Sequence, residues 1–379
     1  MILNETQELV RDTARDFALN RLAPNSRQWE SDAAIPEDVF REMGALGFLG
    51  MTVPEELGGA GLDYVSYAIA LMEIAAGDGA VSTVMSVNNA PVCAILVASG
   101  TPAQQARFLR PLATGEQIGA FALTEPQAGS DAANLRMTAR RVEGGYRLNG
   151  VKQFITSGRI AKTVITFAVS DPTAGKRGIS AFLVPTDAAG FRVAGVEHKL
   201  GQQASDTAQL AYDEVFVEDA LRIGAEGDGY RIALANLEIG RIGIAAQSVG
   251  MAEAALSYAM RYAQERQAFG QPLTGHQAVL FRLADMATQV AAAREFVLSA
   301  AALKEAGRPC LKEACMAKLF ASEAAEKVAS AAIQVLGGYG YVRDYPVEKI
   351  YRDVRVCQIY EGTSDVQRII IGRELLGRS

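Results

Sequence analysis

The sequence predicts a multidomain α+β protein in which a β-rich segment separates two helical regions. Apolar residues recur at helical spacing over residues 1–117 and 233–379. Residues 118–232 instead hold short β-rich runs separated by turn residues. At 379 residues the chain exceeds one ordinary hydrophobic core. We therefore expect an N-terminal helical domain (1–117), a middle β domain (118–232) and a C-terminal helical domain (233–379).

The N-terminal region opens with a helix signal. Asn4 and Gln7 have the spacing of a capping box, and apolar residues then recur at helical spacing as far as Phe17. Pro24 closes this element. The other elements expected here are a helix near Pro36, a glycine-rich loop over 54–62, and helices from about 64 and over about 85–97.

Five β-rich runs define the middle region. They cover residues 119–124, 146–156, 163–169, 178–185 and 207–217, and turn signals such as Glu143-Gly144-Gly145 separate them. Several strands at this spacing indicate a small barrel or a sandwich. The C-terminal region returns to alanine- and leucine-rich helices, the longest over 241–264, 274–305 and 312–336.

Composition excludes several classes of protein. The net charge of −6 argues against a nucleic-acid surface. Apolar runs are interrupted by Glu73 and by Asn88-Asn89, so no membrane span is expected. The first residues lack the apolar core of a signal peptide, which favours a cytoplasmic protein.

Metal and Rossmann sites are not expected either. Four cysteines lack CxxC spacing and there are only two histidines, so buried reduced thiols are the better interpretation. No GxGxxG string follows a strand and opens a helix.

Two strings indicate the function. Residues 359–368 read IYEGTSDVQR and residues 121–131 read FALTEPQAGSD. Together they resemble the acyl-CoA dehydrogenase family, flavoproteins that desaturate acyl-CoA thioesters. The resemblance covers essentially the whole chain and implies the family's order of domains: helices, a β-barrel, and a C-terminal four-helix bundle.

Glu361 is the catalytic base that this resemblance implies. Proton abstraction needs a carboxylate that is ionised yet poorly hydrated, and flexible Gly362 lets the backbone approach closely. Some relatives, including isovaleryl-CoA dehydrogenases, instead carry the base on the helix that holds Gly240 and lack the C-terminal glutamate. Alternatively, Glu361 is a solvated carboxylate at a helix start that Thr363 or Ser364 caps.

The resemblance implies FAD, with two strings against one face of the flavin. Hydroxyls at Thr124 and Ser130 lie where a strand gives way to a turn, where they either bind the cofactor or cap the turn. Phe154 stands where relatives often place a tryptophan, and core packing is its alternative role. The implied FAD contacts here are Phe121, Leu123, Thr124, Gly129, Ser130, Phe154, Ile155 and Thr156.

Further FAD contacts come from segments that the family places across a subunit interface. An arginine at a helix break can clamp pyrophosphate, although it is commonly just solvated, and paired glycines at a helix end are commonly just a C-cap. The resemblance implies a homo-oligomer, a tetramer with a dimer as fallback. The implied contacts are Arg266, Gln267, Ala268, Phe269, His276, Gln277, Gln334, Val335, Leu336, Gly337, Gly338, Thr363, Ser364 and Asp365.

The expected reaction is conversion of an acyl-CoA to the trans-2-enoyl-CoA. An electron-transfer flavoprotein is the acceptor that the family implies. Residues 85–89 and 238–247 look closest to short-chain and short/branched-chain members. The implied substrate contacts are Ser130, Glu238, Arg241, Tyr360, Gly362 and Arg373, where a surface role is the alternative for Arg373.

Two rival functions stay open on the same fold. One is a flavin oxidase or monooxygenase; such relatives commonly lack the base that Glu361 supplies. The other is a non-enzymatic binding protein like the DNA-associated relatives, which the acidic charge disfavours.

Overall fold

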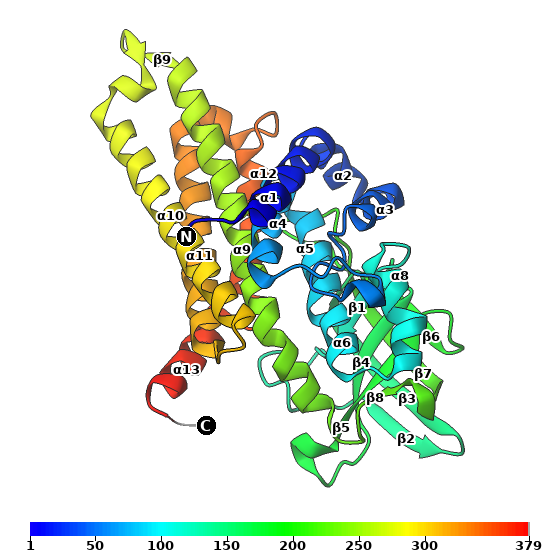
Figure 1. Cartoon of the computed structure of the whole chain (residues 1–379). Coiled ribbons are helices and arrows are strands. Elements are labelled where there is room, and N and C mark those ends of the chain that lie inside the picture. Colours follow the sequence, from blue (N-terminus) through cyan, green and yellow to red (C-terminus); the bar gives the residue numbers. More distant parts are fainter. Residues whose placement is uncertain (378–379) are drawn as a thin grey trace.

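Helices, a mixed sheet and a helical bundle follow one another along the chain in the computed structural model, which describes residues 1–377 (Figure 1). The capping box is confirmed: Asn4 Oδ1 accepts from the Gln7 amide at 2.9 Å, and Gln7 Oε1 accepts from the Asn4 amide at 3.1 Å. The N-terminal helices are α1 (Glu5–Phe17), α2 (Ser26–Asp32), α3 (Glu37–Ala45), α4 (Tyr64–Gly77), α5 (Gly79–Val87), α6 (Ala94–Ser99), α7 (Pro102–Gln104) and α8 (Arg110–Ala113).

The helix expected over residues 85–97 is broken. Proline lacks an amide hydrogen, and Ala90 before Pro91 has non-helical angles (φ −143°, ψ 116°), so α5 and α6 meet at a kink. Beside the break, Asn88 donates to the carbonyls of Leu49 at 2.9 Å and Leu112 at 3.0 Å, which lie on other segments. The asparagines thus satisfy backbone groups inside the protein.

The same segment corrects the premise that no apolar run is long enough to span a membrane. Gly79–Ser99 is 21 residues long and apolar enough to cross a membrane by length and composition. However, 89% of its apolar window is buried inside the protein, as in the core helix of a soluble domain. Apolar content here reflects packing between domains.

The middle region forms one eight-stranded mixed sheet in the order β6-β7-β3-β2-β4-β5-β8, with β1 pairing with β4. β5 also contacts β7, which is not its neighbour in this order, so the sheet curls over its own core as in a barrel. Three short strands, β2, β6 and β8, escaped the sequence prediction; β6 is mostly exposed. The strands are β1 (Gly119–Ala122), β2 (Thr138–Val142), β3 (Gly145–Thr156), β4 (Thr163–Val169), β5 (Ile179–Pro185), β6 (Phe191–Val196), β7 (Thr207–Glu218) and β8 (Arg222–Ile223).

Three long helices build the C-terminal bundle, and α13 packs on α11 as a short fourth member. α9 begins at Gly229 and therefore earlier than expected, because Gly240 lies buried inside the helix and does not mark its start. Figure 1 shows α13 at the end of the bundle opposite the β9–β10 hairpin. The elements are α9 (Gly229–Glu265), β9 (Gln267–Ala268), β10 (Gln271–Pro272), α10 (Gln277–Glu305), α11 (Leu311–Leu336), α12 (Val347–Val354) and α13 (Ser364–Leu375).

Candidate active site

Glu361 lies in a turn between a 3-10 helix (Arg355–Gln358) and α13. Its φ of +53° is uncommon for a residue with a side chain, so the surrounding contacts must hold it there. Its Oε2 atom is buried and has no hydrogen-bond partner among the described residues. Burial raises the pKa of Glu361 to about 7, and the positive charges of Lys318 and Arg241 act in the opposite direction. The alternative of a solvated carboxylate does not describe this side chain.

Gly240 provides the space that the Glu361 carboxylate occupies. A Cβ atom added at Gly240 would lie 2.0 Å from Glu361 Oε2, far inside any allowed contact. Gly240 and Glu361 are the two positions at which members of the resembled family carry their base, and the structure places them side by side. A side chain at 240 and the carboxylate of Glu361 cannot occupy the same place.

The turn is held by two side chains that the sequence did not single out. Lys318 of α11 donates to the carbonyls of Cys357 at 3.0 Å and Gly362 at 2.7 Å. Gln367 of α13 donates to the Gly362 carbonyl at 2.8 Å and the Glu361 carbonyl at 3.4 Å. One signal was available: Lys318 interrupts the buried alanine stripe of α11 (Ala314, Ala317, Ala321 and Ala325).

The neighbouring predicted residues divide into two groups. Arg241 is 5% exposed, acts on the pKa of Glu361, and has an Nε atom without a partner among the described residues. Tyr360 donates its hydroxyl hydrogen to Gln247, and Thr363 caps α13 by accepting from the Val366 amide at 3.3 Å. Both help to fix the turn.

Glu238 and Arg373 point elsewhere. Residues two apart on a helix face opposite sides, so Glu238 is directed away from Gly240. Its carboxylate accepts from Lys304 at 2.9 Å and from the Cys310 thiol at 3.4 Å. Arg373 is exposed on α13. The structure does not bring these two residues to Glu361.

The two strings of the middle domain lie side by side. The Gln153 amide donates to the Thr124 carbonyl at 2.9 Å, and Lys152 donates to the Leu123 carbonyl at 2.9 Å. Lys152 also forms a fully buried ion pair with Glu125 at 2.8 Å, which anchors the loop that ends at Ser130. This contact joins the ends of β1 and β3.

A register shift in β3 shapes the surface beside this loop. Between Lys152 and Ile155 the pairing with β7 slips, Phe154 takes a φ of +57°, and its ring is 62% exposed. Ile155 turns inward, so core packing is not the role of Phe154. Gly129 and Ser130 are exposed as well. An exposed ring beside free loop amides and hydroxyls fits one face of a flavin.

The predicted cofactor residues of 266–277 and 334–338 gather at the end of the bundle opposite α13, where Thr363, Ser364 and Asp365 lie. Arg266 and residues 335–338 line one groove of about 800 Å³, where the Arg266 guanidinium lies 5.7 Å from the Tyr339 ring centroid. In the adjoining hairpin His276 Nε2 lies 3.0 Å from the Ala268 carbonyl oxygen, and Phe269 is 96% exposed. A cation, glycine amides and exposed aromatic rings fit the diphosphate and adenosine part of a dinucleotide.

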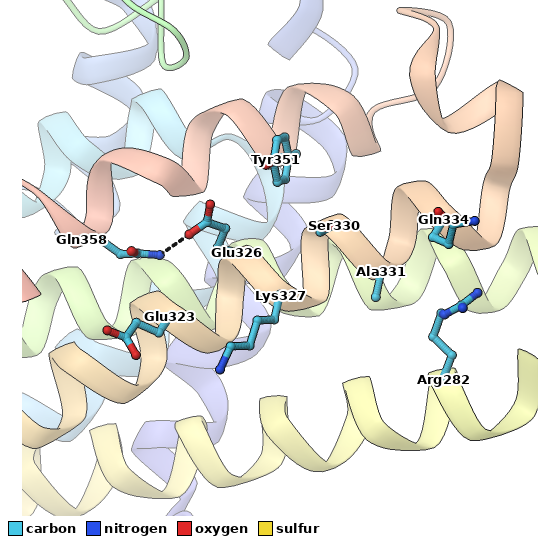
Figure 2. Close-up of a pocket in the computed structure, with 9 residues that line it drawn as sticks. All are labelled: Arg282, Glu323, Glu326, Lys327, Ser330, Ala331, Gln334, Tyr351 and Gln358. Carbon is cyan, nitrogen blue, oxygen red and sulfur yellow. Dashed lines mark hydrogen bonds between the residues drawn. The ribbon is translucent and has the colours of Figure 1, made fainter.

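A second groove, of about 630 Å³, runs along α11 (Figure 2). Figure 2 shows Gln358 at one end, where it donates to Glu326, and Gln334 near Arg282 at the other. Charges of both signs line it. Most of its lining residues lie on α11, the helix that also carries Lys318 and that ends just after Gln334.

Arg266 lies far from Gly240 of the same chain. Arg266 follows Gly240 by 26 positions along α9, or about 39 Å at 1.5 Å rise per residue. Figure 1 likewise shows the hairpin and α13 at opposite ends of the bundle. Glu361, which lies beside Gly240, and Arg266 of one chain are therefore too far apart to share one site.

The pKa of Glu361 leads to a prediction about stability. An unfolded glutamate has a pKa near 4.5 and Glu361 one of about 7, so the folded protein retains a proton that the unfolded chain releases between these values. The resulting stabilisation is complete below pH 4.5 and is lost as pH rises to 7, a change of about 3 kcal/mol. Glu361→Gln should therefore gain stability over wild type across this window in thermal or denaturant unfolding. A gain that is flat with pH would contradict the raised pKa of Glu361.

Comparison with known proteins agrees with these features. Three family models match: the acyl-CoA dehydrogenase N-terminal domain (residues 4–116), middle domain (120–215) and C-terminal domain (227–376). The chain is 48% identical to an acyl-CoA dehydrogenase of Bacillus subtilis over all of both chains. It is 44% identical to the mitochondrial short-chain specific acyl-CoA dehydrogenase of Rattus norvegicus, covering 99% of this chain and 91% of the relative.

A solved structure agrees in fold as well. The butyryl-CoA dehydrogenase of Megasphaera elsdenii is 39% identical with a TM-score of 0.96 and 99% of each chain covered. The domain order, the sheet and the bundle match along the full length. The chain belongs to the acyl-CoA dehydrogenase family of oxidoreductases.

Proposed function

We propose that the protein is an FAD-dependent dehydrogenase of short acyl-CoA thioesters with Glu361 as the base. The observation that carries the proposal is the Glu361 carboxylate, whose Oε2 is buried without a partner among the described residues and lies in the space left by Gly240. An unsatisfied buried acceptor is costly for the fold and suited to taking a proton from a bound substrate.

In the proposed reaction Glu361 takes the α-proton of the acyl group and the α–β double bond forms as the β-hydrogen departs. FAD, when bound, accepts that hydrogen as a hydride. The Glu361 amide donates to the thioester oxygen and stabilises the negative charge that develops there. With a pKa of about 7, a substantial fraction of Glu361 is ionised at neutral pH. Lys318 and Arg241 favour that ionised form.

Two copies of the chain complete each proposed FAD site. The loop 124–130 and residues 154–156 of one copy cover the flavin, with Thr363, Ser364 and Asp365 at the start of α13. The hairpin 266–277 and residues 334–338 of a second copy hold the rest of the dinucleotide. The separation along α9 supports a homo-oligomer, which we propose to be a tetramer.

This arrangement predicts that FAD binding and assembly are coupled. Arg266→Ala removes a charge-assisted contact to the dinucleotide and should weaken FAD binding by about tenfold or more. FAD should raise the thermal midpoint of the wild-type oligomer by mass action. The measurements are FAD titration and light scattering, with exposed Arg308→Ala as the control. A flavin-saturated monomer would refute the shared site.

The acyl chain is proposed to be short because side chains of α4 and α5 close the space beside Glu361. A Cβ atom at Gly243, about one turn or ~5 Å along α9 from Gly240, would lie 2.7 Å from both Ser86 Oγ and the Tyr67 hydroxyl oxygen. Tyr67 is 1% exposed, and the charge of Glu361 reaches its hydroxyl. Tyr67 and Ser86 thus limit the space near Glu361, which favours a short acyl chain, straight or methyl-branched.

Butyryl-CoA and 2-methyl-branched thioesters should therefore give higher kcat/KM than long chains. Each added methylene changes discrimination by about 1–3 kcal/mol. Tyr67→Ala should move the optimum to longer chains, whereas Tyr64→Ala, on the same helix beside Lys304, should leave it in place. A panel of acyl-CoA lengths measures this, and a wild-type optimum at palmitoyl-CoA would overturn the assignment while leaving the reaction class intact.

The decisive test of the function is anaerobic mixing of the FAD-loaded protein with butyryl-CoA. Bleaching of the flavin and formation of the trans-2-enoyl-CoA are the expected results. Electron-transfer flavoprotein or a dye should then reoxidise the protein much faster than oxygen does. Peroxide production at comparable turnover would identify the oxidase alternative, and the absence of bleaching by any acyl-CoA would identify a binding protein.

A further inference from the structure

We propose that Lys318 is a positioning residue for the Glu361 base, because its ammonium group clamps the main chain on both sides of Glu361 and presents a positive charge to the carboxylate. The inference rests on the proposed role of Glu361 as the base. It adds a second helix, α11, to the machinery that sets the position and ionisation of that base.

The clamp is defined by two hydrogen bonds. Lys318 Nζ donates to the carbonyl of Cys357, four residues before Glu361, and to that of Gly362, one residue after it. Lys318 is 1% exposed, so water does not compete for these bonds. One rigid group thereby closes the turn in which Glu361 holds its positive φ.

The charge of Lys318 acts on the site. Within residues 1–377 its two hydrogen-bond acceptors are neutral carbonyls, so no carboxylate neutralises it directly. The groups that interact with its charge are Glu361, the Arg241 guanidinium, and the thiols of Cys315 and Cys357. Burial lowers the pKa of Lys318 to about 8, while Glu361 acts to raise it. Lys318 is therefore mainly charged at neutral pH and favours the ionised, basic form of Glu361.

Gln367 provides a matched comparison. It donates to the same Gly362 carbonyl and also to the Glu361 carbonyl, but it carries no charge. Loss of Gln367 weakens the clamp alone, whereas loss of Lys318 weakens the clamp and removes the charge. The two variants therefore separate position from electrostatics.

The test is the rate of flavin reduction by saturating butyryl-CoA, followed from pH 5.5 to 9.5 by anaerobic stopped flow. Without the cation the pKa of Glu361 rises. The acidic limb of the pH–rate profile of Lys318→Met should therefore lie about one pH unit or more above that of wild type. The rate should fall about tenfold at pH 6.5. Near pH 9, where wild-type Lys318 is itself mostly neutral, the difference between the two rates should shrink to the pH-independent loss that the weakened clamp causes. Gln367→Leu should lower the rate at every pH and leave the limb in place.

The inference would be overturned if the acidic limb of the pH–rate profile of Lys318→Met lay at the same pH as in wild type. Lys318→Gln, which keeps a donor for the carbonyls, is the second variant if the methionine variant does not hold FAD or has a lowered thermal midpoint. A readout without turnover is the carboxylic C=O infrared band that Glu361→Gln deletes, whose titration midpoint should rise in Lys318→Gln.

The two proposals fail in different ways. If Glu361→Gln still reduces its flavin, the assignment of the base is wrong. If Glu361→Gln is inert but neither the limb nor the infrared midpoint moves on loss of Lys318, only the role of Lys318 is wrong.

Discussion

Glu361→Gln is expected to fold, to bind FAD, and to lose flavin reduction by acyl-CoA by about 10³-fold or more. The amide has the shape of the carboxylate but cannot accept the α-proton. The buried Oε2 has no partner among the described residues, so the substitution breaks no hydrogen bond there. The measurement is the single-turnover rate with butyryl-CoA, together with the flavin content.

The matched control for this variant is Glu323→Gln. Glu323 lies on α11 and pairs with Arg368 near the surface, away from the Gly240 space. It should keep the wild-type rate. Reduction by Glu361→Gln at a rate near that of wild type would require a different base.

Gly240→Ala is expected to lower the same rate by about 100-fold or more. The new Cβ would stand 2.0 Å from Glu361 Oε2, so the carboxylate must move, and displacement of a catalytic group by about 1 Å can cost that factor. The segments proposed to cover the flavin, residues 124–130 and 154–156, lie on other elements, so FAD content should change little. Stopped-flow reduction and flavin absorbance measure the two effects.

Gly372→Ala is the control for this helical glycine, because nothing lies within 4 Å of a Cβ added there. Alanine favours a helix over glycine by about 1 kcal/mol, so this variant should be as active as wild type and slightly more stable. A rate for Gly240→Ala within a few-fold of wild type would show that the Glu361 carboxylate acts from another position.

Much of the fold follows from local patterns. The capping box of α1, the apolar face of α3 and five of the strands lie where period and turn residues predicted them. The failures have two causes. α9 contains glycines that packing requires, and the core helix segment Gly79–Ser99 is apolar enough to resemble a membrane span, so in both helices burial by distant elements overrides the local signal. β6 is mostly exposed and is defined by its pairing with β7, which local spacing does not show.

The candidate site divides in the same way. The strings around Thr124, Phe154 and Glu361 were visible in the sequence, and the structure brings the first two into contact. Glu238 had been expected beside the substrate, but the helical period turns it toward Lys304. Arg266 was expected in the cofactor site, and only the length of α9 shows how far it lies from the Glu361 of its own chain.

The sequence by itself determined the residue types that carry the chemistry: a carboxylate between an aromatic residue and a glycine, the absence of a side chain at position 240, and two strings able to hold a flavin. Only the tertiary structure decided how the proposed base is set. Gly240, Lys318 and Glu361 lie on three different segments, and their approach buries Glu361 Oε2 where the charge of the buried Lys318 acts on it. Burial and charge depend on which segments meet in space, and local spacing along the chain does not encode that meeting.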